Sequence, residues 1–143
     1  MAATGQGGSP FYAETELAAA LIGSLEAEGL KVYREVLLNP KYSNRRIDLA
    51  VEVGDLRIGI ECKMSAGLSV VEQARSAWRY FHAVYAAVPM LYPKKIFLDT
   101  CRHFGIGVLA PTHDYRVIPE NRFVDGFVFD RLEEARFNRR PLP

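Results

Sequence analysis

Three polar side chains in the middle of the chain stand at a spacing that suits metal-assisted hydrolysis. Asp48 lies in one alternating segment, and Glu61 and Lys63 lie two residues apart in the next, so both project from the same face of a strand. Carboxylates bind hard cations such as Mg²⁺, and a lysine beside them can hold the attacking water or stabilise charge on a phosphoryl oxygen. These are the groups that metal-assisted hydrolysis of a phosphodiester requires.

The segments that carry these residues are expected to form a β-hairpin. Apolar and polar residues alternate through 47–53 and through 56–64, which is typical of strands with one face on a core. In the first strand this pattern places Ile47 and Leu49 together on the apolar face. The Gly-Asp pair at 54–55 suits a two-residue turn between the strands.

This hairpin brings two carboxylates together. Counting back from the turn, Asp48 lies opposite Glu61, with about 5 Å between their Cβ atoms. On the same polar face, Glu52 lies opposite Arg57 and is expected to form an ion pair with it. The two carboxylates repel each other, and a divalent cation between them removes the conflict. The main-chain carbonyl of Cys62 is an expected further oxygen ligand of that cation.

The Glu-x-Lys spacing alone is a weak signal, because such charges also occur on solvated strand faces. The opposed carboxylates make the pattern more specific, since a sheet normally avoids placing like charges opposite each other. Gly59, nearer the turn, is expected to leave room for the backbone of a substrate to approach.

The remaining elements predict an α/β fold with a mixed sheet. Leucines recur every fourth residue in the first helix, which ends at Gly29. The expected helices cover 11–28, 69–85, 94–104 and 124–139, and the expected strands cover 30–38, 47–53, 56–64, 83–88, 106–110 and 115–118.

The composition is that of one globular domain. The chain has 143 residues, of which 1–10 are rich in small residues and are expected to form a flexible arm before a single domain at 11–143. Cys62 and Cys101 are too few for a disulfide framework, and no apolar run is long enough to span a bilayer. We therefore expect a cytoplasmic protein that makes no contact with a membrane.

Asp48 followed by Glu61-Cys62-Lys63 resembles the signature of the PD-(D/E)XK nuclease superfamily, in the order helix, strand, hairpin, helix. The likeness is strongest to archaeal Holliday-junction resolvases and small restriction-endonuclease-like repair nucleases, and it covers about residues 14–89. It implies a restriction-endonuclease-like α/β/α sandwich with a central mixed β-sheet.

The resemblance also implies further site residues. Glu14 on the first helix corresponds to a third metal-associated carboxylate, with Glu16 as the alternative. Gln73, on the helix after the hairpin, is expected to help order the site. The sequence departs from the family at Ile47, where the signature has proline. It also departs at Ala77, where the exonuclease-like branch has the tyrosine of its Gln-x-x-x-Tyr motif.

The implied activity is that of an endodeoxyribonuclease that uses Mg²⁺ or Mn²⁺, acts in DNA repair, recombination or phage-related DNA processing, and works as a homodimer. The alternative is a nuclease-fold module that binds DNA or a nuclease partner and cuts weakly or not at all. The net charge of +1 favours a local DNA-binding surface or one completed by a partner. The candidate phosphate contacts are Lys41, Arg45, Arg46, Arg75 and Arg79.

Overall fold

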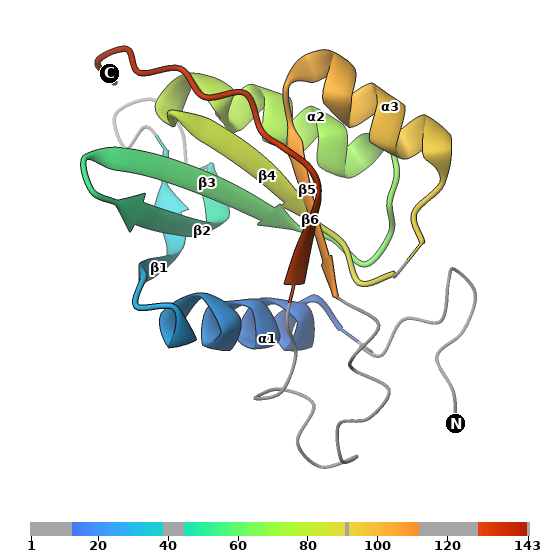
Figure 1. Cartoon of the computed structure of the whole chain (residues 1–143), viewed down its shortest axis with the longest axis horizontal. Helices are drawn as coiled ribbons and strands as arrows, with labels where there is room; N and C mark the ends of the chain where they lie inside the picture. Colours follow the sequence, from blue (N-terminus) through green and yellow to red (C-terminus); the bar gives the residue numbers. More distant parts are fainter. Residues whose placement is uncertain (1–12, 39–44, 91, 112–128, 143) are drawn as a thin grey trace.

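A computed structural model describes residues 13–38, 45–90, 92–111 and 129–142. In this part of the chain a single six-stranded sheet has helices on both of its faces (Figure 1). The helices are α1 (Glu14–Ala27), α2 (Leu68–Ala77), the 3₁₀ turn η1 (Trp78–Tyr80) and α3 (Lys95–Phe104). The strands are β1 (Lys31–Leu37), β2 (Arg46–Val53), β3 (Leu56–Cys62), β4 (Ala83–Ala87), β5 (Gly107–Pro111) and β6 (Phe129–Glu133).

The sheet is mixed, and its strands lie side by side in the order in which they occur in the sequence. The first three strands form an antiparallel meander. Strands β3, β4 and β5 are parallel, because α2 and α3 carry the chain back between them. Strand β6 runs antiparallel to β5. The predicted α/β class with a central mixed sheet is confirmed.

Each face of the sheet has its own apolar core. Helix α1 covers one face (Figure 1), and its Leu17 and Leu21 belong to an apolar cluster with Leu49 and Ile60 of the sheet. Helices α2 and α3 cover the other face with a second cluster, which includes Val70, Ala74, Phe81, Phe97 and Val108. This three-layer arrangement is consistent with the predicted restriction-endonuclease-like sandwich. Among the described helices, none has the length and apolar character needed to cross a membrane.

The predicted C-terminal helix at 124–139 is wrong, because Phe129–Glu133 forms strand β6 and the chain from 134 to 142 is not helical. Without β6, one edge of β5 would leave its main-chain groups unpaired, and this pairing outweighs the local helical pattern. The helix expected at 69–85 ends at Ala77. The predicted arm at 1–10 and the predicted strand at 115–118 lie outside the described residues.

Candidate active site

The predicted hairpin register is confirmed from Val53–Leu56 to Leu49–Ile60. Regular pairing ends one step before Asp48. There the Asp48 N–H donates to Glu61 Oε1 at 3.2 Å, and the Cys62 N–H donates to Asp48 Oδ2 at 2.7 Å. Each carboxylate therefore accepts a main-chain hydrogen bond from the opposite strand, and the two side chains converge where β2 and β3 leave the regular ladder.

Strand β2 loses its regular alternation at Asp48. Ile47 packs in the core beneath α2 and α3, whereas Leu49 packs in the core beneath α1. In a regular strand, residues two apart lie on the same face, so the predicted common face for Ile47 and Leu49 is wrong. The strand turns over at Asp48, where its N–H donates to a side chain.

The neighbouring strand β1 is also irregular beside Asp48. Its ladder with β2 contains the pairs Arg34–Leu49 and Val36–Ile47 but skips the position between them, Glu35 opposite Asp48. Glu35 has a φ of +47°, which is uncommon for a residue other than glycine. Asp48 is therefore flanked by an irregular position on each side.

The Glu61 carboxylate is buried, with 5% of its side chain exposed. Burial and then the negative charge of Asp48 raise the pKa of Glu61 from 4.5 to about 7. The hydrogen bond from the Asp48 N–H and the positive charge of Arg45 act in the opposite direction. Arg45 Nη2 lies 3.7 Å from Glu61 Oε2. The negative charge of Asp48 therefore disfavours the ionised form of Glu61.

Helix α1 brings Glu14 to the same end of the hairpin. Lys63 Nζ lies 3.9 Å from Glu14 Oε2. A pocket of about 280 Å³ between α1 and the sheet has Glu14, Asp48 and Cys62 in its lining, and Glu16 is not among its lining residues. Burial, followed by the charges of Asp48, Glu61 and Glu14, raises the pKa of the Cys62 thiol. Of the two helix carboxylates, Glu14 is the one that the fold brings to the candidate site.

Gln73 reaches the site through its main chain. Its carbonyl accepts a hydrogen bond from Arg45 Nη2 at 2.7 Å, and Arg45 Nη1 donates to the Ser76 hydroxyl. Arg45 therefore joins Glu61 to helix α2. The sequence marked Arg45 only as a candidate phosphate contact, because nothing in the local pattern indicates a contact with a helix 28 positions away.

The other candidate phosphate contacts are spread over the molecule. Arg46 donates to the Glu35 carbonyl, Arg75 stacks on the Phe104 ring and Arg79 lies over the Tyr80 ring. Lys41 lies outside the described residues.

The residues present fit a loosely held Mg²⁺ or Mn²⁺. Within the described ranges, no three histidine, cysteine, aspartate or glutamate side chains gather closely enough to hold a metal ion by themselves. Mg²⁺ commonly binds through one or two carboxylates and completes its shell with water and substrate phosphates. Asp48 and Glu61 supply such a pair, and Glu14 lines the same pocket as Asp48.

Two expectations about the hairpin are wrong. A Cβ atom at Gly59 would lie 2.5 Å from Ile47 Cδ1 and 2.8 Å from Phe81 Cδ2, so core side chains fill the space expected for a substrate. Glu52 accepts a hydrogen bond from the Tyr33 hydroxyl at 3.1 Å in place of the expected ion pair with Arg57.

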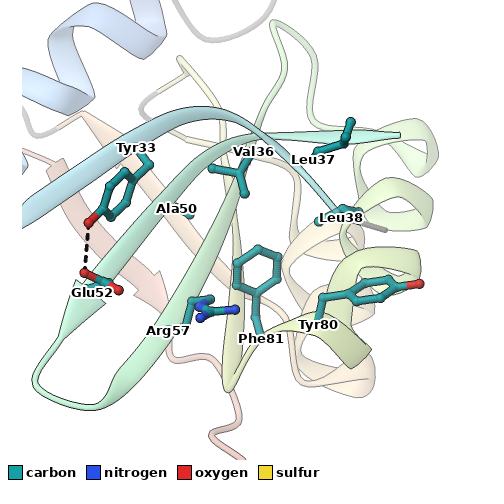
Figure 2. Close-up of a pocket in the computed structure, with 9 residues that line it drawn as sticks. All are labelled: Tyr33, Val36, Leu37, Leu38, Ala50, Glu52, Arg57, Tyr80 and Phe81. Atoms are coloured by element: carbon teal, nitrogen blue, oxygen red, sulfur yellow. Dashed lines mark hydrogen bonds between the residues drawn. The ribbon is translucent and has the colours of Figure 1, made fainter. Parts of the chain in front are cut away.

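A second pocket of about 320 Å³ has Tyr33, Glu52 and Arg57 in its lining, with Tyr33 and Glu52 joined by their hydrogen bond (Figure 2). This pocket lies between β1 and η1, and it contains none of Glu14, Asp48, Glu61 and Lys63.

The mixed sheet between two helical layers, with paired carboxylates where the hairpin leaves its ladder, defines an α/β sandwich consistent with the restriction-endonuclease-like fold. No family model matches the chain, and no curated protein matches it. Among solved structures, the chain is similar to a protein of unknown function from Silicibacter pomeroyi. The two are 17% identical with a TM-score of 0.56, and the match covers 93% of this chain and 77% of that one.

Two further solved structures are similar. An XisH family protein from Nostoc punctiforme is 17% identical, with a TM-score of 0.52 and coverage of 71% of this chain and 94% of that one. A second protein of unknown function is 16% identical, with a TM-score of 0.54 and coverage of 65% and 56%. At these identities the likeness shows the fold alone.

Proposed function

We propose that this protein is a Mg²⁺- or Mn²⁺-dependent endodeoxyribonuclease of the PD-(D/E)XK type, acting in DNA repair, recombination or phage-related DNA processing. The observation that carries the proposal is the convergence of Asp48 and Glu61 at the end of the hairpin, each bonded to the main chain of the other strand. The two carboxylates repel each other, and a bound divalent cation would relieve that repulsion. As a homodimer, the protein would present two such sites to two DNA strands.

Each residue of the proposed site would have a separate role in hydrolysis. Asp48 and Glu61 would hold the cation, together with the main-chain carbonyl of Cys62. The bound cation would polarise the phosphodiester and lower the pKa of a coordinated water. Lys63 would hold the attacking water or stabilise charge on the phosphoryl oxygen. Glu14 would assist as the third metal-associated carboxylate, and its Oε2, 3.9 Å from Lys63 Nζ, would also orient the lysine. The main-chain carbonyl of Gln73 would keep Arg45 beside Glu61.

A second candidate function is a module that binds DNA or a nuclease partner without effective cleavage. The net charge of +1 favours it, because gripping many phosphates normally needs a basic excess. In addition, Lys63 and Arg45 each already lie within ion-pair distance of a carboxylate. This function predicts binding of DNA with no cation-dependent turnover.

Incubation of the purified protein with branched, single-stranded and duplex DNA, in Mg²⁺, Mn²⁺ or EDTA, separates the two functions. We expect cation-dependent cleavage of at least one DNA form, absent in EDTA and abolished by Asp48→Asn. Glu52→Gln on the same hairpin is the matched control, because it also replaces a carboxylate by the amide of the same shape but lies outside the site. A wild type that binds DNA and never cuts it with either cation contradicts the nuclease proposal.

A further inference from the structure

The positively charged Arg45 guanidinium lies beside a carboxylate of the proposed metal site. Its Nη2 lies 3.7 Å from Glu61 Oε2, while the other oxygen, Oε1, accepts the Asp48 N–H. The two oxygens of Glu61 are therefore engaged on different sides, one toward Asp48 and one toward Arg45. A guanidinium beside a carboxylate that is 5% exposed neutralises a charge that water hardly reaches.

The guanidinium is held in this position by helix α2. Arg45 Nη2 donates to the Gln73 carbonyl at 2.7 Å, and Nη1 donates to the Ser76 hydroxyl, which in turn donates to the same carbonyl at 3.0 Å. The backbone of Arg45 is fixed as well, because the Leu38 N–H donates to its carbonyl at 2.9 Å. These contacts hold the positive charge next to Glu61 from two sides.

We propose that Arg45 is an internal counter-ion that competes with the divalent cation for Glu61 and so sets the cation affinity of the site. The proposal rests on the cation site put forward above. Arg45 is a positioning residue, since it acts through Glu61. Any interaction that stabilises the cation-free site more than the loaded site weakens cation binding by the same factor. An anchored guanidinium does so, because it already offsets the negative charge of Glu61 and repels a cation that shares this carboxylate.

The functional consequence is a site that loads weakly on its own and more strongly with substrate. A DNA phosphate brings negative charge and a further oxygen ligand, which offset the repulsion from Arg45. The cation would therefore be retained chiefly in the presence of DNA.

The test measures Ca²⁺ affinity by calorimetry in the absence of DNA, so it does not depend on turnover. Arg45→Gln should bind Ca²⁺ at least ~10-fold more tightly than the wild type, because the competing charge is lost. Arg46→Gln is the matched control. It removes the same charge from the adjacent residue, whose guanidinium donates to the Glu35 carbonyl, and it should change the affinity less than ~3-fold. Arg45→Lys, which keeps the charge, should stay closer to the wild type than Arg45→Gln does.

Unchanged or weaker Ca²⁺ binding in Arg45→Gln overturns the proposal, and so does equal tightening in Arg46→Gln. Arg45→Lys behaving like Arg45→Gln also overturns it, because charge would then not be the cause. If Arg45→Gln does not fold, side-chain NMR of the wild type replaces it. The Arg45 guanidinium signals, assigned with Arg45→Lys, should shift on Ca²⁺ saturation, and a lack of shift counts against competition. A wild type that binds no cation at all refutes the cation site itself, whereas normal Asp48-dependent binding with no Arg45 effect refutes only this inference.

Discussion

Replacing Glu61 by glutamine isolates the cost of burying a second carboxylate beside Asp48. The pKa of Glu61 is raised from 4.5 to about 7, so between these values the folded protein keeps a proton that the unfolded chain has released. Where the folded state binds more protons, the free energy of unfolding falls as the pH rises. One pKa unit corresponds to about 1.4 kcal/mol, so the cation-free wild type should lose about 3 kcal/mol across this window.

The assay is urea unfolding of EDTA-treated protein at intervals between about pH 4.5 and pH 8. Other carboxylates titrate as well, so the informative quantity is the difference between wild type and Glu61→Gln, which should rise toward about 3 kcal/mol in favour of the variant across the window. Asp48→Asn should remove only part of the pH dependence, since burial is the first cause of the raised pKa and the Asp48 charge the second. Glu52→Gln, an exposed carboxylate on the same hairpin, should behave like the wild type.

A flat difference between wild type and Glu61→Gln across this pH range would refute the reasoning, because Glu61 would then not be a buried carboxylate in conflict with Asp48. Millimolar Ca²⁺ should reduce the pH dependence of the wild type but not that of Asp48→Asn. An equal effect of Ca²⁺ on both proteins would place the cation elsewhere.

Three further outcomes are expected. Millimolar Mg²⁺ or Mn²⁺ should raise the melting temperature of the wild type and not that of Asp48→Asn, and an unchanged shift in the variant would contradict the assigned ligands. Lys63→Ala should lower the rate of cleavage at least ~100-fold, a loss of about 2.7 kcal/mol of transition-state stabilisation, and should largely keep the Ca²⁺ affinity. Lys95→Ala is the control, because Lys95 pairs with Asp99 on α3. Gly59→Ala should cost about 1–3 kcal/mol of stability in urea unfolding, since its methyl group would lie 2.5 Å from Ile47 Cδ1; Gly67→Ala, with no atom within 4 Å, should cost less.

Most of the fold could be predicted because its signals are local. The turn at 54–55 and the alternation on either side of it fix the hairpin register, which the structure confirms at five pairs. The C-terminal strand β6 could not be predicted, because its conformation depends on the edge of β5 rather than on its own pattern. The contact of Arg45 with Gln73 and Ser76 could not be predicted from the sequence either, since it depends on how α2 packs against the sheet.

At the candidate site, residue types and spacing can be predicted from the sequence, whereas the local strand pairing cannot. Residue types and spacing predict that Asp48 and Glu61 lie close together. Alternation, however, assumes regular pairing, and that assumption fails where side chains replace the ladder bonds. Regular pairing fails on both sides of Asp48. The ladder of β1 with β2 skips Glu35 opposite Asp48, and on the β3 side the Asp48 N–H donates to the Glu61 side chain. Irregular backbone tends to persist where a site requires it, and local sequence rules tend to fail at the same places. Both departures coincide at Asp48, the residue whose carboxylate accepts the Cys62 N–H and whose own N–H donates to Glu61, so the irregular pairing and the two carboxylates occupy the same place in the sheet.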